Sequence, residues 1–203
     1  MSMDFIEDIA ALEGLYGAPG EPSLRKVARQ MTPAYRKWIM ASRFCVLSTV
    51  GPEGTDGSPR GDDGPVVQEL DPQRLLLPDW RGNNRIDSLR NIVADGRVSL
   101  MFMVPGSDTV VRVNGTAKVT LDDDLRARLG HKGKQPRSVI VIRIGEIYSQ
   151  CARAVMRARL WAAGDEGAGL PSMGDILHEM TQGAIDGKAY DQEWPGRAAR
   201  TMW

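Results

Sequence analysis

The central part of the chain, residues 44–148, is a succession of short segments rich in β-branched and apolar side chains, separated by turn residues. The six or seven strands expected from it are residues 44–50, 55–61, 66–70, 75–77, 97–104, 109–120 and 138–148. Helical segments do not alternate regularly with them, which argues against a doubly wound parallel sheet. Gly115, inside the segment 109–120, predicts a bulge or sharp bend, as where a sheet curls on itself. The pattern therefore predicts a mainly β fold, a small antiparallel barrel with short peripheral helices.

Helical patterns precede this β-region. Residues 4–16, 24–30 and 32–42 have apolar side chains at helical spacing. Thr32 followed by Pro33 is typical of an N-cap and a first helical position. We expect the helical segment at the N-terminus to pack on the barrel.

The region after the barrel is expected to begin with an arginine-rich helix at residues 151–161. A glycine-rich linker at 164–169 and an amphipathic helix at 172–182 follow. Trp194 and Trp203 indicate that the tail docks against another part of the protein. We therefore divide the chain into an N-terminal helical segment (1–43), a barrel domain (44–161), and a C-terminal linker, helix and tail (162–203).

The stretch between the fourth and fifth expected strands has the character of an anion site. A strand that ends at Pro78 leads into a turn at Gly82, and then into a helix with Asn84 or Asp87 as its N-cap. The unpaired N–H groups and positive dipole end of a helix N-terminus favour phosphate, and the guanidinium of Arg85 adds to them. The alternative is a surface turn whose arginines are merely solvated.

The overall charge and the cysteine content exclude several classes of protein. Lys+Arg and Asp+Glu number 26 each, so the net charge is zero, which argues against a nucleic-acid-binding protein. No apolar run approaches the roughly 18 residues that span a bilayer, and the acidic N-terminus is unlike a signal peptide. Two cysteines are too few for a disulfide framework. We therefore expect a cytoplasmic protein with no nucleic-acid or membrane partner.

The chain shows no sequence motif of a nucleophilic or metal-dependent enzyme. His131 and His178 are isolated and are expected to be solvated surface residues, so no metal site is predicted. Cys45 lies within an expected strand as a core residue, and no base accompanies Cys151. With no nucleophile–base pair to name, the catalytic residues stay unknown, and any chemistry has to come from a bound cofactor.

The order of several motifs resembles the pyridoxamine 5'-phosphate oxidase-like FMN-binding proteins. The motifs are Ser58–Asp62, Leu75–Asp79, Gly82–Ile92, Arg97–Leu100, Cys151–Ala154 and Arg157–Trp161. The resemblance implies a split β-barrel that forms a homodimer, with FMN in a groove at the subunit interface. It also implies that FMN phosphate and ribityl contacts come from Arg60, Asn83, Asn84, Arg85 and Ser88. The segment with Arg157, Arg159 and Trp161 would lie near the flavin, either within its own subunit or reaching across from the other.

The chain departs from true pyridoxamine 5'-phosphate oxidases in places that matter for the substrate. Their Arg-x-Val-Leu-Leu-Lys strand and Ser-Arg-Lys turn are replaced by Ser58–Gly61 and by Asp87 with Ser88, and their C-terminal Arg-x-His segment is not recognisable. The leading hypothesis is therefore an FMN-dependent oxidoreductase acting on an unknown small molecule. The alternatives are a flavin- or haem-binding protein without turnover and a deazaflavin-dependent reductase.

Overall fold

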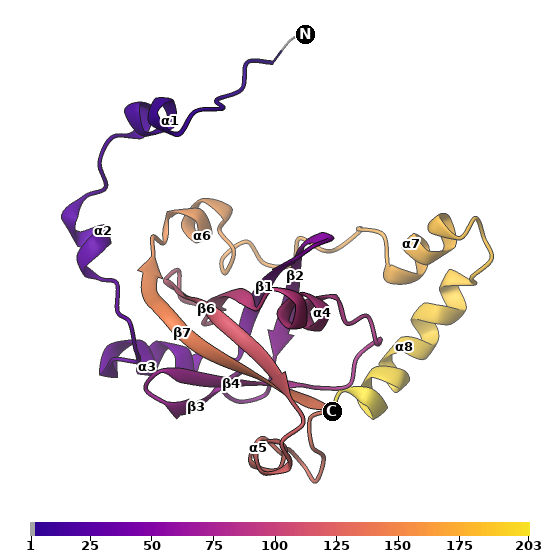
Figure 1. The fold of residues 1–203 in the computed structure, drawn as a ribbon. Coiled ribbons are helices and arrows are strands. Elements are labelled where there is room, and N and C mark those ends of the chain that lie inside the picture. The colour runs from indigo at the N-terminus through magenta and orange to yellow at the C-terminus, as the bar shows by residue number, and fades with distance from the viewer. Residues whose placement is uncertain (1–2) are drawn as a thin grey trace.

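The computed structural model describes residues 3–203, so Met1 and Ser2, the start of the expected N-terminal segment, lie outside the described residues. Its centre is a seven-stranded antiparallel sheet in the order β2-β1-β5-β6-β7-β4-β3 (Figure 1). The strands are β1 (Phe44–Gly51), β2 (Gly54–Gly61), β3 (Gln68–Asp71), β4 (Arg74–Asp79), β5 (Arg97–Met103), β6 (Val110–Thr120) and β7 (Ser138–Gln150). The predicted fold class, mainly β with an antiparallel split barrel and short peripheral helices, is confirmed.

The bend predicted at Gly115 is also confirmed. The register of β6 against β7 shifts between Asn114 and Gly115, which marks a bulge in the longest ladder of the sheet. A Cβ at Gly115 would collide with the carbonyl oxygen of Arg143 on β7. Glycine is required here because the two backbones approach too closely for any side chain.

Strand β4 does not end at Pro78, as we expected, but continues to Asp79. Pro78 lies opposite Val139 in the β4–β7 ladder. Strand β3 pairs with β4 only as far as Leu76, so β4 has a free edge at the proline. The missing N–H of a proline breaks no ladder bond at such an edge, which explains why the strand tolerates it.

The barrel interior is filled mainly by aliphatic side chains from all the long strands. Its fully buried members include Leu47, Leu75, Leu77, Leu100, Phe102, Ile140, Ile142 and Ile147. Helix α3 (Pro33–Ala41) packs on this core through the fully buried Ile39, with Tyr35 and Trp38 partly buried beside it. The hydroxyl of Thr32 accepts the Tyr35 N–H at 3.3 Å, so the predicted N-cap is confirmed.

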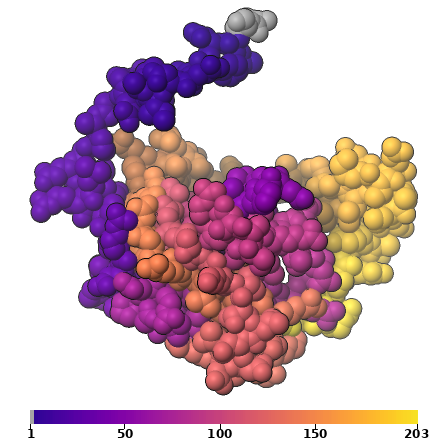
Figure 2. All heavy atoms as spheres, in the orientation of Figure 1, coloured from indigo at the N-terminus to yellow at the C-terminus, as the bar shows by residue number. Residues whose placement is uncertain are grey.

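The first part of the N-terminal segment does not pack on the barrel in this single chain. Helices α1 (Ile9–Tyr16) and α2 (Glu21–Arg25) bury no side chain and extend away from the sheet (Figures 1 and 2). The chain first reaches the sheet at Ala28, which pairs with Ile147. Both helices are shorter than expected, and α1 begins at Ile9 because the Asp8 carboxylate caps it.

Two short helices connect strands of the sheet. Helix α4 (Asp87–Ala94) packs against β1, β2 and β6, while α5 (Asp123–Arg128) contacts β7 and is capped by the Asp122 carboxylate. Helix α4 therefore holds the segment that carries the predicted anion site against the barrel wall.

The C-terminal region holds one helix that the sequence did not predict. Helix α6 (Arg153–Ala158) is shorter than expected, because Arg159 adopts a left-handed conformation (φ 49°) and ends it. Helix α7 (Met173–Met180) forms a hairpin with α8 (Gly187–Thr201), which was missed because Pro195 and weak amphipathicity obscure its pattern. No helix within residues 3–203 is both long and apolar enough to cross a membrane.

Candidate functional site

A cavity of about 480 Å³ lies where β2, the end of β4 and the start of α4 meet. Residues 56–60 of β2 form one wall, residues 79–80 and 82–89 form a second, and Arg137 with Ser138 close it near the start of β7. The antiparallel pairing of Asp79 with Ser138 brings the ends of β4 and β7 to the same place. The predicted anion stretch therefore borders a half-open cavity.

Arg60 is the most enclosed cation of this cavity. Its Nη1 lies 2.6 Å from the Asp79 carboxylate, and both side chains are less than one-fifth exposed. The Nε of Arg60 is buried and has no hydrogen-bond partner among the described residues. A buried donor left unpaired is costly, so it indicates a place for a ligand oxygen.

The start of α4 differs from our expectation in its capping. The N-cap is Ile86, not Asn84 or Asp87, and no side chain caps the first turn. Asn84 takes a left-handed conformation (φ 62°), where it cannot cap the helix, and Asp87 pairs with the Arg85 Nε at 2.6 Å. Because the leading N–H groups of α4 have no side-chain cap, they are available to an anion.

Hydrogen bonds hold the polar groups around this helix end. The hydroxyl of the buried Ser88 donates to the Asp56 carboxylate on β2. Arg137 Nη1 donates to Asn84 Oδ1 at 2.7 Å, and the Asn83 side-chain oxygen accepts the N–H of the residue two positions later at 2.9 Å. The turn is therefore tied to β2 and to the residue before β7.

Cations and carboxylates balance around the cavity. Three arginines, Arg60, Arg85 and Arg137, line it together with the carboxylates of Asp56, Asp79 and Asp87. The hydrogen bond to Asp87 raises the pKa of Arg85, so that guanidinium stays charged. An anionic ligand would compete with these carboxylates for the guanidinium groups.

Cysteine chemistry is not available at this site. Burial raises the pKa of Cys45 on β1 to about 12, so its thiol is protonated at neutral pH. Cys151 lies outside the cavity, at the end of β7. The cavity is therefore a binding site whose chemistry would depend on what it holds.

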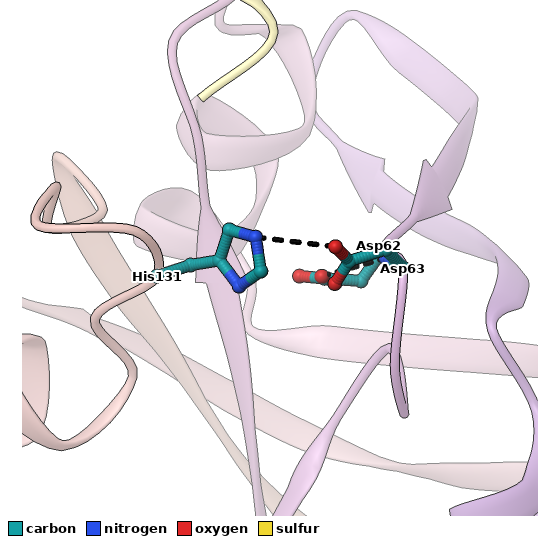
Figure 3. A group of neighbouring side chains, drawn as sticks. All are labelled: Asp62, Asp63 and His131. Atoms are coloured by element: carbon teal, nitrogen blue, oxygen red, sulfur yellow. Dashed lines mark hydrogen bonds and ion pairs between the residues drawn. The ribbon is translucent and has the colours of Figure 1, made fainter.

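One cluster that includes a histidine escaped the sequence analysis. His131 is partly buried and is not the solvated residue we expected; its Nε2 lies 3.2 Å from Asp63, beside Asp62 (Figure 3). The Lys132 ammonium lies 3.2 Å from the same Asp63 oxygen and already neutralises it. The indole N–H of Trp80 donates to Asp62 at 3.1 Å. Lys132 and Trp80 already engage the two carboxylates, so the cluster carries no proposal of a metal.

The sequence of the chain matches a known protein family. The sequence pattern of the family described as pyridoxamine 5'-phosphate oxidase matches residues 31–151, more than half of the chain. The chain belongs to this family. Its members typically bind FMN. No curated protein is similar enough to the chain to count as a match.

Several solved structures are similar to part of this chain. HupZ from Group A Streptococcus is 18% identical, with a TM-score of 0.48, over 59% of this chain and 93% of its own. A Lactobacillus delbrueckii protein described as a candidate pyridoxamine 5'-phosphate oxidase is 25% identical, with a TM-score of 0.47, over 60% and 95%. An FMN-binding protein from Syntrophomonas wolfei is 17% identical, with a TM-score of 0.44, over 57% and 83%. These scores are below 0.5, so the family assignment depends on the sequence match.

The structure of this chain brings together five of the eight predicted site residues. Arg60, Asn83, Asn84, Arg85 and Ser88 all line the cavity. Arg157, Arg159 and Trp161 do not line it, and the Trp161 indole donates to the carbonyl of Ser107 at 2.9 Å. Their role in a second subunit stays a prediction.

Sequence reasoning missed four residues that line the same cavity. Asp56, Asp79, Arg137 and Ser138 come from three separate parts of the chain. Asp79 directly follows the expected strand and could have been suspected from its place in the Pro-Asp pair. No local signal marked Asp56 or Ser138, because strand pairing alone brings them to the site.

Proposed function

We propose that this protein binds FMN in the cavity at the start of α4 and works as an FMN-dependent oxidoreductase on a small molecule. The observation that carries the proposal is the buried, unpaired Nε of Arg60, beside a helix start without a side-chain cap. The Ser138 hydroxyl, also buried and unpaired, lines the same cavity and adds a second free donor. This set of donors suits a phosphate group.

Each residue has a definable task in holding the FMN phosphate. Arg60 would contribute its free Nε while Asp79 fixes the other side of the guanidinium. Arg85 is 80% exposed and could turn from Asp87 to a phosphate oxygen with little loss of packing. Ser88 is oriented by Asp56 and supports the first turn of α4. The site is preorganised on the β2 side and adaptable on the turn.

The flavin would supply the electron-transfer chemistry when bound, and the chain would supply binding and orientation. Cys45 cannot act as a nucleophile at neutral pH, since its thiol is buried and protonated. The sequence departures at Ser58–Gly61 and Asp87–Ser88 argue against vitamin B6 as the substrate. The identity of the small molecule therefore stays open within the oxidoreductase proposal.

The proposal includes a homodimer with FMN at its interface. Leu160 and Trp161 follow α6 and are 49% and 40% exposed in the single chain. A second subunit covering them would bring Arg157, Arg159 and Trp161 toward the flavin, as the resemblance implies. The large exposed apolar side chains beyond the barrel support such an interface.

The experiment that tests this function is an absorbance spectrum of the purified protein, with mass analysis of the released chromophore. We expect FMN, and we expect the double variant Arg60→Ala, Arg85→Ala to lose flavin affinity by about 100-fold or more, since it removes two charge-assisted contacts. Arg90→Ala is the matched control, because Arg90 is exposed on α4 and does not line the cavity.

Other outcomes would overturn the assignment. A haem spectrum or a bound deazaflavin would replace FMN as the cofactor. Unchanged FMN affinity in the double variant would show that the cavity at α4 is not the phosphate site.

A further inference from the structure

The C-terminal tail is held against the barrel by the side chain of Trp203. Its ring stands edge-to-face to Trp80 at 5.4 Å between centroids and lies 4.4 Å from the His131 ring. The Lys132 ammonium lies 5.8 Å from the Trp203 ring centroid, and the Lys134 ammonium donates to the Trp203 carbonyl at 3.1 Å. Trp203 therefore has four partners, three of them in one turn at residues 131–134.

Trp80 connects this contact to the candidate cofactor site. It follows Asp79, which pairs with Arg60, and it lines the same cavity. Its indole N–H is fixed by Asp62 at 3.1 Å, so the ring stands between the cavity and the tail. Met202 extends the contact, since it lines a neighbouring small cavity together with Arg60 and Trp80.

The loop that begins at Trp80 depends on few other anchors. Residues 80–86 form neither helix nor strand, and residues 81–86 are exposed. This loop carries Asn83, Asn84 and Arg85, the predicted phosphate contacts. Besides Trp80, the side-chain bond from Arg137 to Asn84 ties the loop to the barrel. The position of the loop therefore depends on how firmly Trp80 is held.

The packing of helix α8 does not explain why Trp203 lies against Trp80. Helix α8 already packs on α7, where Gly174 and Gly187 are in close contact and the Asp191 carboxylate accepts the Gly174 N–H at 2.9 Å. The tail nevertheless continues past α8 to place an aromatic ring on Trp80, which lines the cavity.

We propose that Trp203 is a positioning residue for the cofactor phosphate: by packing on Trp80 it holds the loop 80–86 in the conformation that binds the anion. The inference rests on the proposed function, because it assumes that the cavity holds FMN. It concerns the phosphate end of the cofactor, since Asn83, Asn84 and Arg85 are the groups that the loop carries.

Two ligands that differ only in the phosphate provide the test. We expect Trp203→Ala to weaken FMN binding about three- to tenfold, the range expected from the loss of an aromatic pair, while riboflavin affinity changes little. Trp203→Phe should restore most of the FMN affinity, because a phenyl ring can still pack edge-to-face on Trp80. The near-ultraviolet circular dichroism of the Trp80–Trp203 pair should be lost in Trp203→Ala without any flavin present.

Trp194→Ala is the matched control for loss of a tail tryptophan. Trp194 lies on α8, stacks on Tyr190 and does not line the cavity, so its removal should leave FMN affinity unchanged. If Trp203→Ala binds FMN as tightly as the wild type, or weakens riboflavin equally, the inference is wrong. If the wild type binds neither flavin, the proposed function itself fails, and the inference falls with it.

Discussion

Among the side chains that line the cavity, Ser138 is the clearest case of a residue expected to contribute to ligand binding and not to stability. Its hydroxyl is buried at the start of β7 and has no partner among the described residues. A buried hydroxyl without a partner stabilises nothing in the ligand-free protein. Its presence is better explained by a ligand than by the fold.

The variant Ser138→Ala should therefore behave differently in the two assays. Its thermal unfolding midpoint should equal or exceed that of the wild type, because no hydrogen bond is lost. Its affinity for FMN should fall about tenfold or more, since one hydrogen bond to the charged phosphate disappears. Calorimetric titration with FMN and a thermal scan check both. A large drop in the midpoint would indicate a structural bond at Ser138 instead.

Gly115 shows the opposite kind of residue, one whose role is purely structural. A Cβ there would collide with the Arg143 carbonyl, and the backbone of β7 cannot move aside without breaking the ladder. Gly115→Ala should lower the free energy of unfolding by at least about 2 kcal/mol. Urea unfolding measures this loss. Gly57→Ala on β2 is the control, because its added Cβ meets no atom within 4 Å; equal losses in the two variants would contradict the argument.

At the scale of elements, α1 stands apart from the rest of the chain. It has exposed apolar residues, Ile9, Leu12 and Leu15 among them, and buries none of them in the single chain. Because α1 packs on no part of its own subunit, deleting residues 3–16 should leave the unfolding midpoint of the dissociated monomer at high dilution unchanged. Ile39→Ala in α3 should lower stability by about 2–5 kcal/mol, because Ile39 is fully buried. A clear loss of stability on deleting α1 would show that it packs on the protein in solution.

The attachment of α3 to β3 should depend on pH. Arg36 on α3 makes two hydrogen bonds to the Glu69 carboxylate on β3, at 2.6 and 2.7 Å. The hydrogen bond from Arg36 lowers the pKa of Glu69 below its ordinary value. Because the folded pKa is the lower one, this contribution is fully present above about pH 4.3 and is lost as the pH falls through the folded pKa.

The variant Glu69→Gln tests this pH dependence. Its unfolding midpoint should be lower than that of the wild type at pH 7, and the difference should shrink toward zero as the wild-type carboxylate is protonated in acid. Thermal scans from neutral pH to about pH 3 measure it. Glu53→Gln, at an exposed turn between β1 and β2, is the control and should show no such trend. A constant difference across the pH range would mean that the ion pair is not its source.

At the scale of the whole molecule, the proposed dimer explains where apolar surface is left uncovered. Large exposed apolar side chains concentrate outside the barrel, in α1 and in the region after β7. Exposed apolar side chains in such numbers often mark surfaces that another protein covers. A second subunit is the partner that the family resemblance implies.

Mixing two defective variants tests whether both subunits build one site. Arg60→Ala removes a contact in the cavity of its own subunit, and Trp161→Ala removes one that we propose comes from the other. If each FMN site takes Arg60 from one subunit and Trp161 from the other, a heterodimer of the two variants should have one intact FMN site and one that lacks both residues. Neither homodimer should bind FMN well. Flavin content after mixing, with light scattering for the mass, measures this. Monomers that retain FMN, or mixtures with no recovery, would contradict the shared site.

The sequence by itself determined the features that depend on near neighbours in the chain. The strands, the Thr32 cap and the bend at Gly115 follow from local propensity and sterics. The grouping of Asn83, Asn84, Arg85 and Ser88 was predictable for the same reason, since one turn and one helix start carry them all.

Only the tertiary structure decided what surrounds that turn. Strand pairing brings Asp79 opposite Ser138, and chain packing sets Trp203 against Trp80 from more than a hundred residues away. The tertiary structure also leaves α4 without the side-chain N-cap predicted from the sequence. Asp87 pairs with Arg85 instead, and Asn84 accepts a hydrogen bond from Arg137. Register and packing depend on the free energy of the whole chain, which no local pattern of residues encodes.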